Sequence, residues 1–124
     1  MAEHNSLGKW GEELTVEYLV KEGYAIVERN WRVNRLEVDI IASKGRVMAF
    51  VEVKTRRSAE GMDPLQAMTP QKIRHLVNAA NSYIRMTRTP LSPRFDIATI
   101  IGDTHGYSFD YIADAFRPPL RTYR

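Results

Sequence analysis

Residues 36–54 of the chain read LEVDIIASKGRVMAFVEVK. Two runs rich in apolar residues, 36–42 and 46–54, lie on either side of Lys44-Gly45. Apolar runs of this length around a glycine-containing turn are typical of a β-hairpin. Strands joined by so short a turn pair antiparallel, because a parallel pair needs a long crossover connection. We therefore expect two adjacent antiparallel strands in this part of the chain.

The predicted hairpin carries charged residues in an unusual place. Strand side chains alternate between faces, so Glu37 and Asp39 share one face of the first strand, and Glu52 and Lys54 share one face of the second. Asp39 and Glu52 could then face each other across the pair. Two neighbouring carboxylates repel unless a cation lies between them, and a hard divalent ion such as Mg²⁺ is the natural candidate. The pattern thus suggests a metal site with Lys54 pointing into it.

Glu12 adds a third carboxylate on a predicted first helix. Its i+4 and i+7 positions are Val16 and Leu19, so this side of the helix is apolar and Glu12 should partly face inward. Two simpler explanations remain for these charges. A Glu-x-Lys pair on one strand face can be a solvated ion pair. A glutamate in the first half of a helix is favoured by the helix dipole.

Helical periodicity and turn residues place the other elements. A helix is predicted by the spacing of Leu7, Trp10, Leu14 and Tyr18, with Asn5 or Ser6 as its cap and Gly23 at its end. A second helix should begin at Thr69-Pro70, because threonine caps helices and proline suits the first helical position. Further strands are expected at residues 24–32, 95–101 and 107–112, a loop at 55–69, and a linker at Pro90 and Pro93.

The predicted order is therefore α-β-β-β-α-β-β, a mixed α/β fold in which two helices flank one central sheet. The 124 residues fit one domain. We place that domain at residues 1–116 and a C-terminal tail at 117–124.

Composition excludes several classes of protein. The chain has no cysteine, which rules out a disulfide framework, a thiolate metal site and a cysteine nucleophile. Any metal would have oxygen ligands, which favours Mg²⁺ or Mn²⁺. No apolar run is long enough to span a membrane, and the first residues do not resemble a signal peptide. We therefore expect a cytoplasmic protein without a membrane partner.

The charge is unevenly distributed. The chain has 18 Lys+Arg and 15 Asp+Glu. Residues 1–30 contain three bases and six acids, whereas residues 31–124 contain 15 bases and nine acids. A basic body suggests a polyanionic partner such as nucleic acid. An ordinary arginine-rich surface is the alternative.

Several motifs resemble the YraN-like family, a group of small bacterial proteins predicted to be nucleases. The motifs are Gly8-x-x-Gly11-Glu12, Glu37-x-Asp39-Ile40-Ile41-Ala42, Phe50-Val51-Glu52-Val53-Lys54-Thr55-Arg56, Phe95-Asp96 and Asp114-Ala115-Phe116. The resemblance covers roughly residues 7–116, and the Phe50–Arg56 block is its most specific part. One departure is Leu36, where the family usually has glycine.

The resemblance implies a restriction-endonuclease-like αβββαβ core, similar to archaeal Holliday-junction resolvases. It further implies a Mg²⁺- or Mn²⁺-dependent endonuclease acting on DNA, with branched or junction DNA as a candidate substrate, and a homodimer. Asp39 and Glu52 would bind the metal, Lys54 would serve the attacking water, and Glu12 would approach the metal directly or through water. The resemblance also implies that Thr55, Arg56 and Lys72 contact nucleic acid. Arg57 is expected to do so as well, because it is basic and lies in the predicted loop.

Two other functions remain open at this point. The protein could bind nucleic acid without cleaving it, since Arg56, Arg57, Arg85 and Arg88 fall in predicted loop or solvent positions. It could also act on RNA, because phosphate contacts do not distinguish the two sugars. The aromatic residues left for base stacking are Trp31, Tyr107, Tyr111 and Tyr123. The three histidines show no metal-ligand spacing and are expected on the surface.

Overall fold

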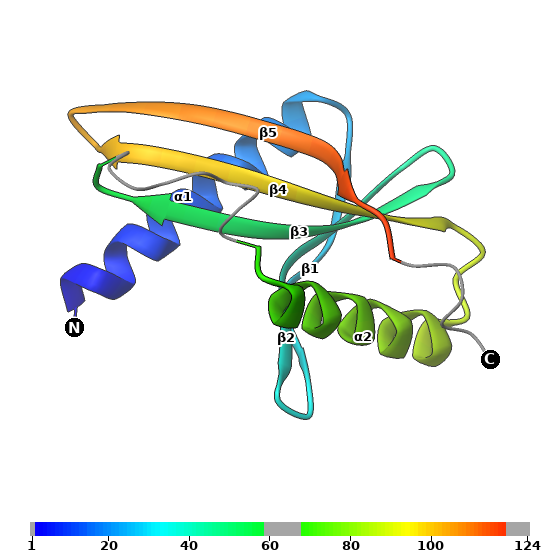
Figure 1. Ribbon diagram of the computed structural model, residues 1–124. Helices are drawn as coiled ribbons and strands as arrows, with labels where there is room; N and C mark the ends of the chain where they lie inside the picture. Colours follow the sequence, from blue (N-terminus) through cyan, green and yellow to red (C-terminus); the bar gives the residue numbers. More distant parts are fainter. Residues whose placement is uncertain (1, 59–67, 119–124) are drawn as a thin grey trace.

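The computed structural model describes residues 2–58 and 68–118, with the backbone alone for residues 2–5. Its elements are α1 (Ala2–Lys21), β1 (Ala25–Val33), β2 (Leu36–Lys44), β3 (Val47–Arg56), α2 (Pro70–Thr87), β4 (Ser92–Asp103) and β5 (Gly106–Phe116). Figure 1 shows this order along the chain. The predicted α-β-β-β-α-β-β order is confirmed.

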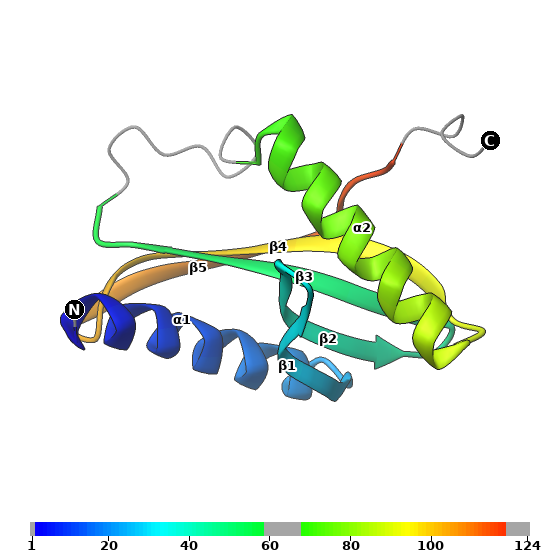
Figure 2. The same ribbon diagram turned by 90° about the horizontal axis from the view of Figure 1, so that it is seen from below.

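The five strands form one mixed sheet in chain order, β1-β2-β3-β4-β5. Neighbouring strands are antiparallel except β3 and β4, which are parallel. A parallel pair needs a crossover, and α2 provides it. Figure 2 shows α1 and α2 on opposite faces of the sheet. The architecture is a mixed α/β fold, consistent with the restriction-endonuclease-like fold.

Local signals set the ends of α2. The Thr69 side chain accepts a hydrogen bond from the Lys72 backbone N–H, and Pro70 occupies the first turn. The helix ends at Arg88, which adopts a left-handed conformation with φ of 55°. The predicted helix start is therefore confirmed, because capping depends on residues that are adjacent in the sequence.

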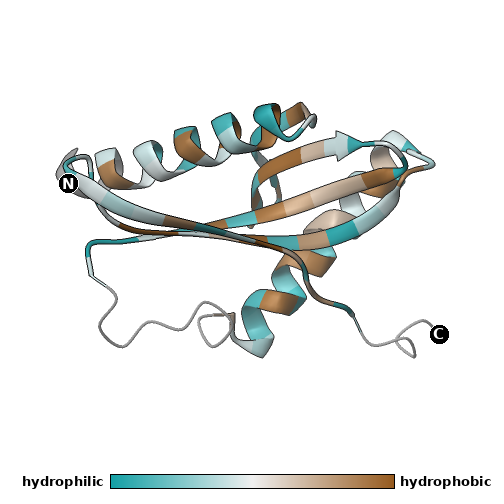
Figure 3. Ribbon diagram, turned by 90° about the horizontal axis from the view of Figure 1, so that it is seen from above, coloured by the Kyte–Doolittle hydropathy of each residue, from teal (hydrophilic) through white to brown (hydrophobic). Residues whose placement is uncertain are grey.

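The sheet separates two apolar clusters, one under each helix. On the α2 side, the fully buried Phe50 and Ile41 pack with Leu76 and Tyr83 of α2. On the α1 side, Leu19 packs with Ile40, Val51, Ala98 and Ile100 of the sheet. Figure 3 shows hydrophobic residues along the central strands and alternating polar and apolar turns along both helices. Each fully buried aliphatic side chain stabilises the fold by roughly 1.5–3 kcal/mol.

The strands are longer than the sequence predicted. β3 continues through Thr55 and Arg56, which were expected to open a loop. Pro93, expected in a linker, lies in β4 opposite Met48 of β3. Proline is tolerated there because β5 pairs with β4 only from Phe95 onward, which leaves that side of β4 open. Of the predicted tail at 117–124, residues 119–124 lie outside the described residues.

Candidate functional site

Asp39 and Glu52 meet where the pairing of β2 and β3 ends. The antiparallel register runs from Lys44 opposite Val47 to Ile40 opposite Val51, so the next positions are Asp39 and Glu52. Beyond that point, the Val53 backbone N–H donates a hydrogen bond of 2.8 Å to Asp39 Oδ2. The Asp39 carboxylate therefore accepts a backbone hydrogen bond at the end of the paired register. This contact fixes the carboxylate beside β3.

The surroundings of Asp39 disfavour its charged form. Burial and the nearby charge of Glu52 raise the pKa of Asp39 to about 7, although the Val53 hydrogen bond acts in the opposite direction. The charges of Glu12 and Glu37 raise this pKa further, by less than burial and Glu52 do. A bound cation would relieve this repulsion.

Lys54 compensates Glu52 but leaves Asp39 without a matching positive charge. Lys54 is 7% exposed, and its Nζ lies 3.1 Å from Glu52 Oε2. Lys72 reaches the same place from the first turn of α2, and its pKa is lowered by contact with Lys54 and by that residue's charge. Two lysines and two carboxylates therefore converge from β2, β3 and α2.

Glu12 approaches from the other helix. It is half-buried, and its Oε1 accepts a hydrogen bond of 3.3 Å from Asn30 of β1. Burial raises its pKa. The adjacent Glu13 is exposed and forms an ion pair of 2.9 Å with Arg29 instead. The inward orientation expected for Glu12 is therefore observed.

The lack of a side chain at Gly11 allows α1, which carries Glu12, to approach β3 closely. A Cβ atom at Gly11 would collide with Oγ1 of Thr55 on β3, whereas a Cβ at Gly8 would meet nothing within 4 Å. The Thr55 side chain thus packs against α1, on the opposite face of the sheet from Lys54. The structure does not bring Thr55 to the carboxylates.

Glu37, Asp39 and Glu52 line a pocket of about 230 Å³ between the β1–β2 hairpin and α2, and Glu12 is not among its lining residues. Its basic side chains are Arg35 before β2 and Lys72 and His75 on α2. Sequence reasoning missed Arg35 and His75 as members of the site. His75 follows Lys72 by three residues, close to one helical turn, and this spacing was the available signal. Leu36 also lines the pocket and packs against the α2-side core.

Arg56 and Arg57 lie outside this pocket. Arg56 is exposed, and its guanidinium donates a hydrogen bond to the Thr55 carbonyl oxygen at 2.8 Å. Arg57 lines a separate hollow of about 300 Å³ together with Trp10 and His105. The contacts predicted between these two arginines and nucleic acid would therefore lie outside the carboxylate pocket.

The donor set fits a hard divalent ion better than a softer metal such as zinc. Within residues 2–58 and 68–118, no group of three or more His, Cys, Asp or Glu side chains is arranged to hold a metal. Mg²⁺ usually takes only one or two carboxylates and completes its shell with water and phosphate. Asp39 and Glu52 supply two hard oxygen ligands of this kind. Their arrangement thus fits Mg²⁺ or Mn²⁺.

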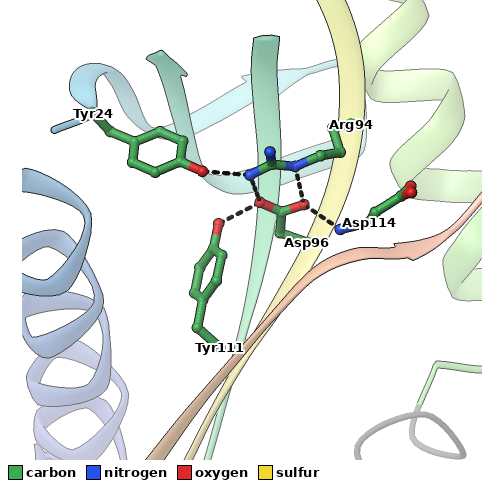
Figure 4. A network of polar contacts seen from close by, with 5 residues as sticks. All are labelled: Tyr24, Arg94, Asp96, Tyr111 and Asp114. Carbon is green, nitrogen blue, oxygen red and sulfur yellow. Dashed lines mark hydrogen bonds and ion pairs between the residues drawn. The ribbon is translucent and has the colours of Figure 1, made fainter. Parts of the chain in front are cut away.

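A second charged cluster lies between β4 and β5 and is fully hydrogen-bonded. Arg94 donates to both oxygens of the buried Asp96, at 2.9 and 2.7 Å, and to the Tyr24 hydroxyl at 2.5 Å. The Tyr111 hydroxyl and the Asp114 backbone N–H also donate to Asp96, at 2.5 and 2.9 Å. Figure 4 shows the four donors around one carboxylate. With its acceptor sites used within the protein, Asp96 has a structural role.

Comparisons with known proteins point to one family. The model of the uncharacterised protein family UPF0102 matches residues 11–100. A UPF0102 protein of Bacteroides fragilis is 48% identical over 120 residues, which cover 97% of this chain and 99% of the relative. A UPF0102 protein of Flavobacterium psychrophilum is 44% identical over 116 residues, covering 94% and 98%. One from Parabacteroides distasonis is 42% identical over 121 residues, covering 98% and 100%.

Proposed function

The chain belongs to the uncharacterised protein family UPF0102, and we propose that it is a metal-dependent phosphodiesterase that cleaves DNA. The family match confirms the resemblance to YraN-like proteins drawn from the sequence motifs. The observation that carries the proposal is the pairing of Asp39 with Glu52 beside the buried Lys54. Two close carboxylates and one lysine are suited to metal-assisted hydrolysis of a phosphodiester.

Each residue of the pocket has a role in this reaction. Asp39 and Glu52 would bind Mg²⁺ or Mn²⁺, which when bound polarises a phosphoryl oxygen and makes water more acidic. The Val53 N–H holds the Asp39 carboxylate in place. Lys54, held beside Glu52, orients the attacking water or stabilises charge that develops on the phosphate. Hydrolysis adds the water oxygen to phosphorus and breaks one ester bond.

The basic groups around the pocket bind the substrate. Lys72 and His75 on α2 and Arg35 on the hairpin supply positive or hydrogen-bonding groups for the phosphates next to the scissile bond. Glu12 approaches the metal from α1, directly or through water. Arg56 and Arg57 contact nucleic acid away from the carboxylates, whereas Thr55, predicted to do so, packs against Gly11 of α1.

A cleavage panel tests the proposal. Labelled branched, single-stranded and duplex DNA, with matching RNA, are incubated with Mg²⁺ or Mn²⁺. We expect cleavage of DNA by the wild type and a loss of at least about 100-fold in Asp39→Asn and Lys54→Met. Glu13→Gln and Asp110→Asn are matched controls, because both residues are exposed acids outside the pocket. Equal activity in Asp39→Asn and wild type would refute the assignment.

One observation favours a second function, binding of nucleic acid without catalysis. Arg56, Arg85 and Arg88 are exposed basic side chains outside the carboxylate pocket, and a polyanion can reach them. If the protein binds nucleic acid without cleaving it, calorimetry detects no Mn²⁺ binding, and DNA binding depends on the salt concentration but not on a divalent ion.

We also propose that the protein acts in the cytoplasm and as a homodimer. No helix within the described part of the chain is long and apolar enough to cross a membrane. The dimer follows only from the similarity to resolvases, which act on two-fold junctions. Light scattering at the working concentration measures the oligomeric state directly.

A further inference from the structure

The solvent-facing side of α2 carries a regular polar stripe. Arg74, Asn78, Asn81 and Arg85 are spaced by four, three and four residues, so they lie along one side of the helix. All four are exposed. The buried residues of α2, which include Leu76 and Tyr83, lie on the sheet side. The two arginines are separated by 11 residues, which is about three turns and ~16 Å. We call these four residues the α2 stripe.

Charge is polarised across the sheet. α2 contains three basic residues, Lys72, Arg74 and Arg85, and no acidic one. α1, on the opposite face, contains four acids and two bases. None of the ion pairs between described residues involves α2. A polyanion is therefore attracted to the α2 face and not to the α1 face.

The α2 stripe begins next to the carboxylate pocket. Lys72 and His75 of the first turns line that pocket, and Arg74 lies between them in the sequence. The positive end of the helix dipole is at this same terminus. The stripe and the pocket therefore share the first turns of α2 but lie on different sides of the helix.

The composition of the α2 stripe favours binding of double-stranded over single-stranded nucleic acid. Proteins that bind single strands combine cations with exposed aromatic residues on which bases stack. α2 is described throughout, and its one aromatic residue, Tyr83, is buried against the sheet. Arginine and asparagine side chains both donate hydrogen bonds to phosphate oxygens. A span of ~16 Å along the axis of a duplex corresponds to about five base-pair steps of 3.4 Å.

We infer that the α2 stripe binds the phosphate backbone of a duplex arm of DNA on the solvent side of α2, outside the carboxylate pocket. The inference deepens the proposed nuclease function and rests on it for the choice of DNA. Phosphate contacts carry no sequence information, so this surface binds duplexes of any sequence equally.

Salt-dependent binding tests the stripe without catalysis. Fluorescence polarisation of a labelled DNA duplex is measured in EDTA over a series of salt concentrations, with wild type and Arg74→Gln/Arg85→Gln. Each lost phosphate contact lowers the slope of log K against log salt by about 0.9, so the double variant should lose about 1.8. Arg74→Lys/Arg85→Lys keeps the charge and should keep the slope. Lys9→Gln/Lys21→Gln removes the same charge from exposed positions of α1 and should leave the slope unchanged.

The outcomes separate this inference from the proposed cleavage. An unchanged slope in the α2 double variant overturns the inference, as does an equal loss in the α1 control. Tighter binding of single-stranded DNA or of duplex RNA than of duplex DNA also overturns it. Thermal unfolding confirms that each variant is folded. If the α2 variant loses its slope while the wild type cleaves nothing in Mg²⁺ or Mn²⁺, the stripe stands and the nuclease proposal fails.

Discussion

The carboxyl group of Asp39 is held in a position that disfavours its charge. Burial and Glu52 both favour the protonated form, and only the Val53 N–H opposes them. Lys54 lies beside Glu52, so its positive charge compensates that residue first. At the scale of single residues, the pocket thus contains a carboxylate whose negative charge a bound cation would balance.

This environment makes the stability of the metal-free protein depend on pH. The pKa of Asp39 is about 7 in the folded protein, against 3.8 for an unperturbed aspartate. The folded state therefore binds more protons than the unfolded state between these values, and the free energy of unfolding falls as pH rises from about 4 to about 7. One pKa unit corresponds to about 1.4 kcal/mol, so the loss is on the order of a few kcal/mol.

Urea unfolding in EDTA at several pH values measures this effect. Asp39→Asn cannot ionise and should lack this part of the decrease, so its stability should gain on the wild type as pH rises. Parallel curves for the two proteins would show that Asp39 titrates normally. At the highest pH values of the series, added Mn²⁺ should stabilise the wild type more than Asp39→Asn.

At the scale of elements, the contact of α1 with β3 depends on one residue without a side chain. Gly11 lies against Thr55, and Glu12 follows directly on the helix. The Thr15 hydroxyl donates a hydrogen bond to the Gly11 carbonyl oxygen at 2.8 Å, in the same buried contact. The position of Glu12 therefore depends on how closely the helix and the strand approach.

Alanine substitutions at the two glycines of α1 should have opposite effects. Gly11→Ala places a methyl group on Thr55 Oγ1 and should destabilise the protein by about 1–3 kcal/mol through overpacking. Gly8→Ala has open space and should be neutral or stabilise by up to about 1 kcal/mol through helix propensity. Chemical denaturation measures both.

A second substitution tests whether the contact with Thr55 causes the loss of stability in Gly11→Ala. Thr55→Ala removes the oxygen that the new methyl group meets, so it should restore part of the stability lost in Gly11→Ala. If the two substitutions are simply additive, the contact is not the reason for the loss.

At the scale of the whole molecule, a buried network connects parts of the chain that are distant in sequence. Arg94 and Tyr24 are 70 residues apart, and Asp96 joins them to Tyr111 on β5. Burial and the charge of Asp96 raise the pKa of Tyr111 well above its usual range. The network holds β4, β5 and the start of β1 together on the side of the sheet away from the pocket.

Breaking this network should cost stability without a direct effect on the chemistry. Asp96→Ala leaves Arg94 without its partner and should destabilise the fold by about 3–5 kcal/mol. Tyr111→Phe removes one hydrogen bond and should cost about 1–2 kcal/mol. Asp110→Asn, an exposed neighbour on β5, should stay within about 0.5 kcal/mol of the wild type. Thermal or urea unfolding gives the ranking, and an Asp96→Ala protein as stable as Asp110→Asn would contradict it.

The sequence by itself determined the order of the elements and the strand face on which Asp39 and Glu52 lie. The structure places the two-residue turn at Gly45-Arg46, one position after the predicted Lys44-Gly45, and this position sets the register that brings Asp39 opposite Glu52. The start of α2 at Thr69-Pro70 was equally readable. These features depend on residues close together in the chain, so local chemistry decides them.

Only the tertiary structure decided which other side chains join or leave the site. The fold brings Arg35 and His75 to the pocket, turns Thr55 toward Gly11, and assembles the network around Asp96. It also places an acidic and a basic helix on opposite faces of the sheet. These relations depend on how each helix packs across the sheet. Such packing comes from contacts between residues far apart in the chain, which leave no local pattern in the sequence.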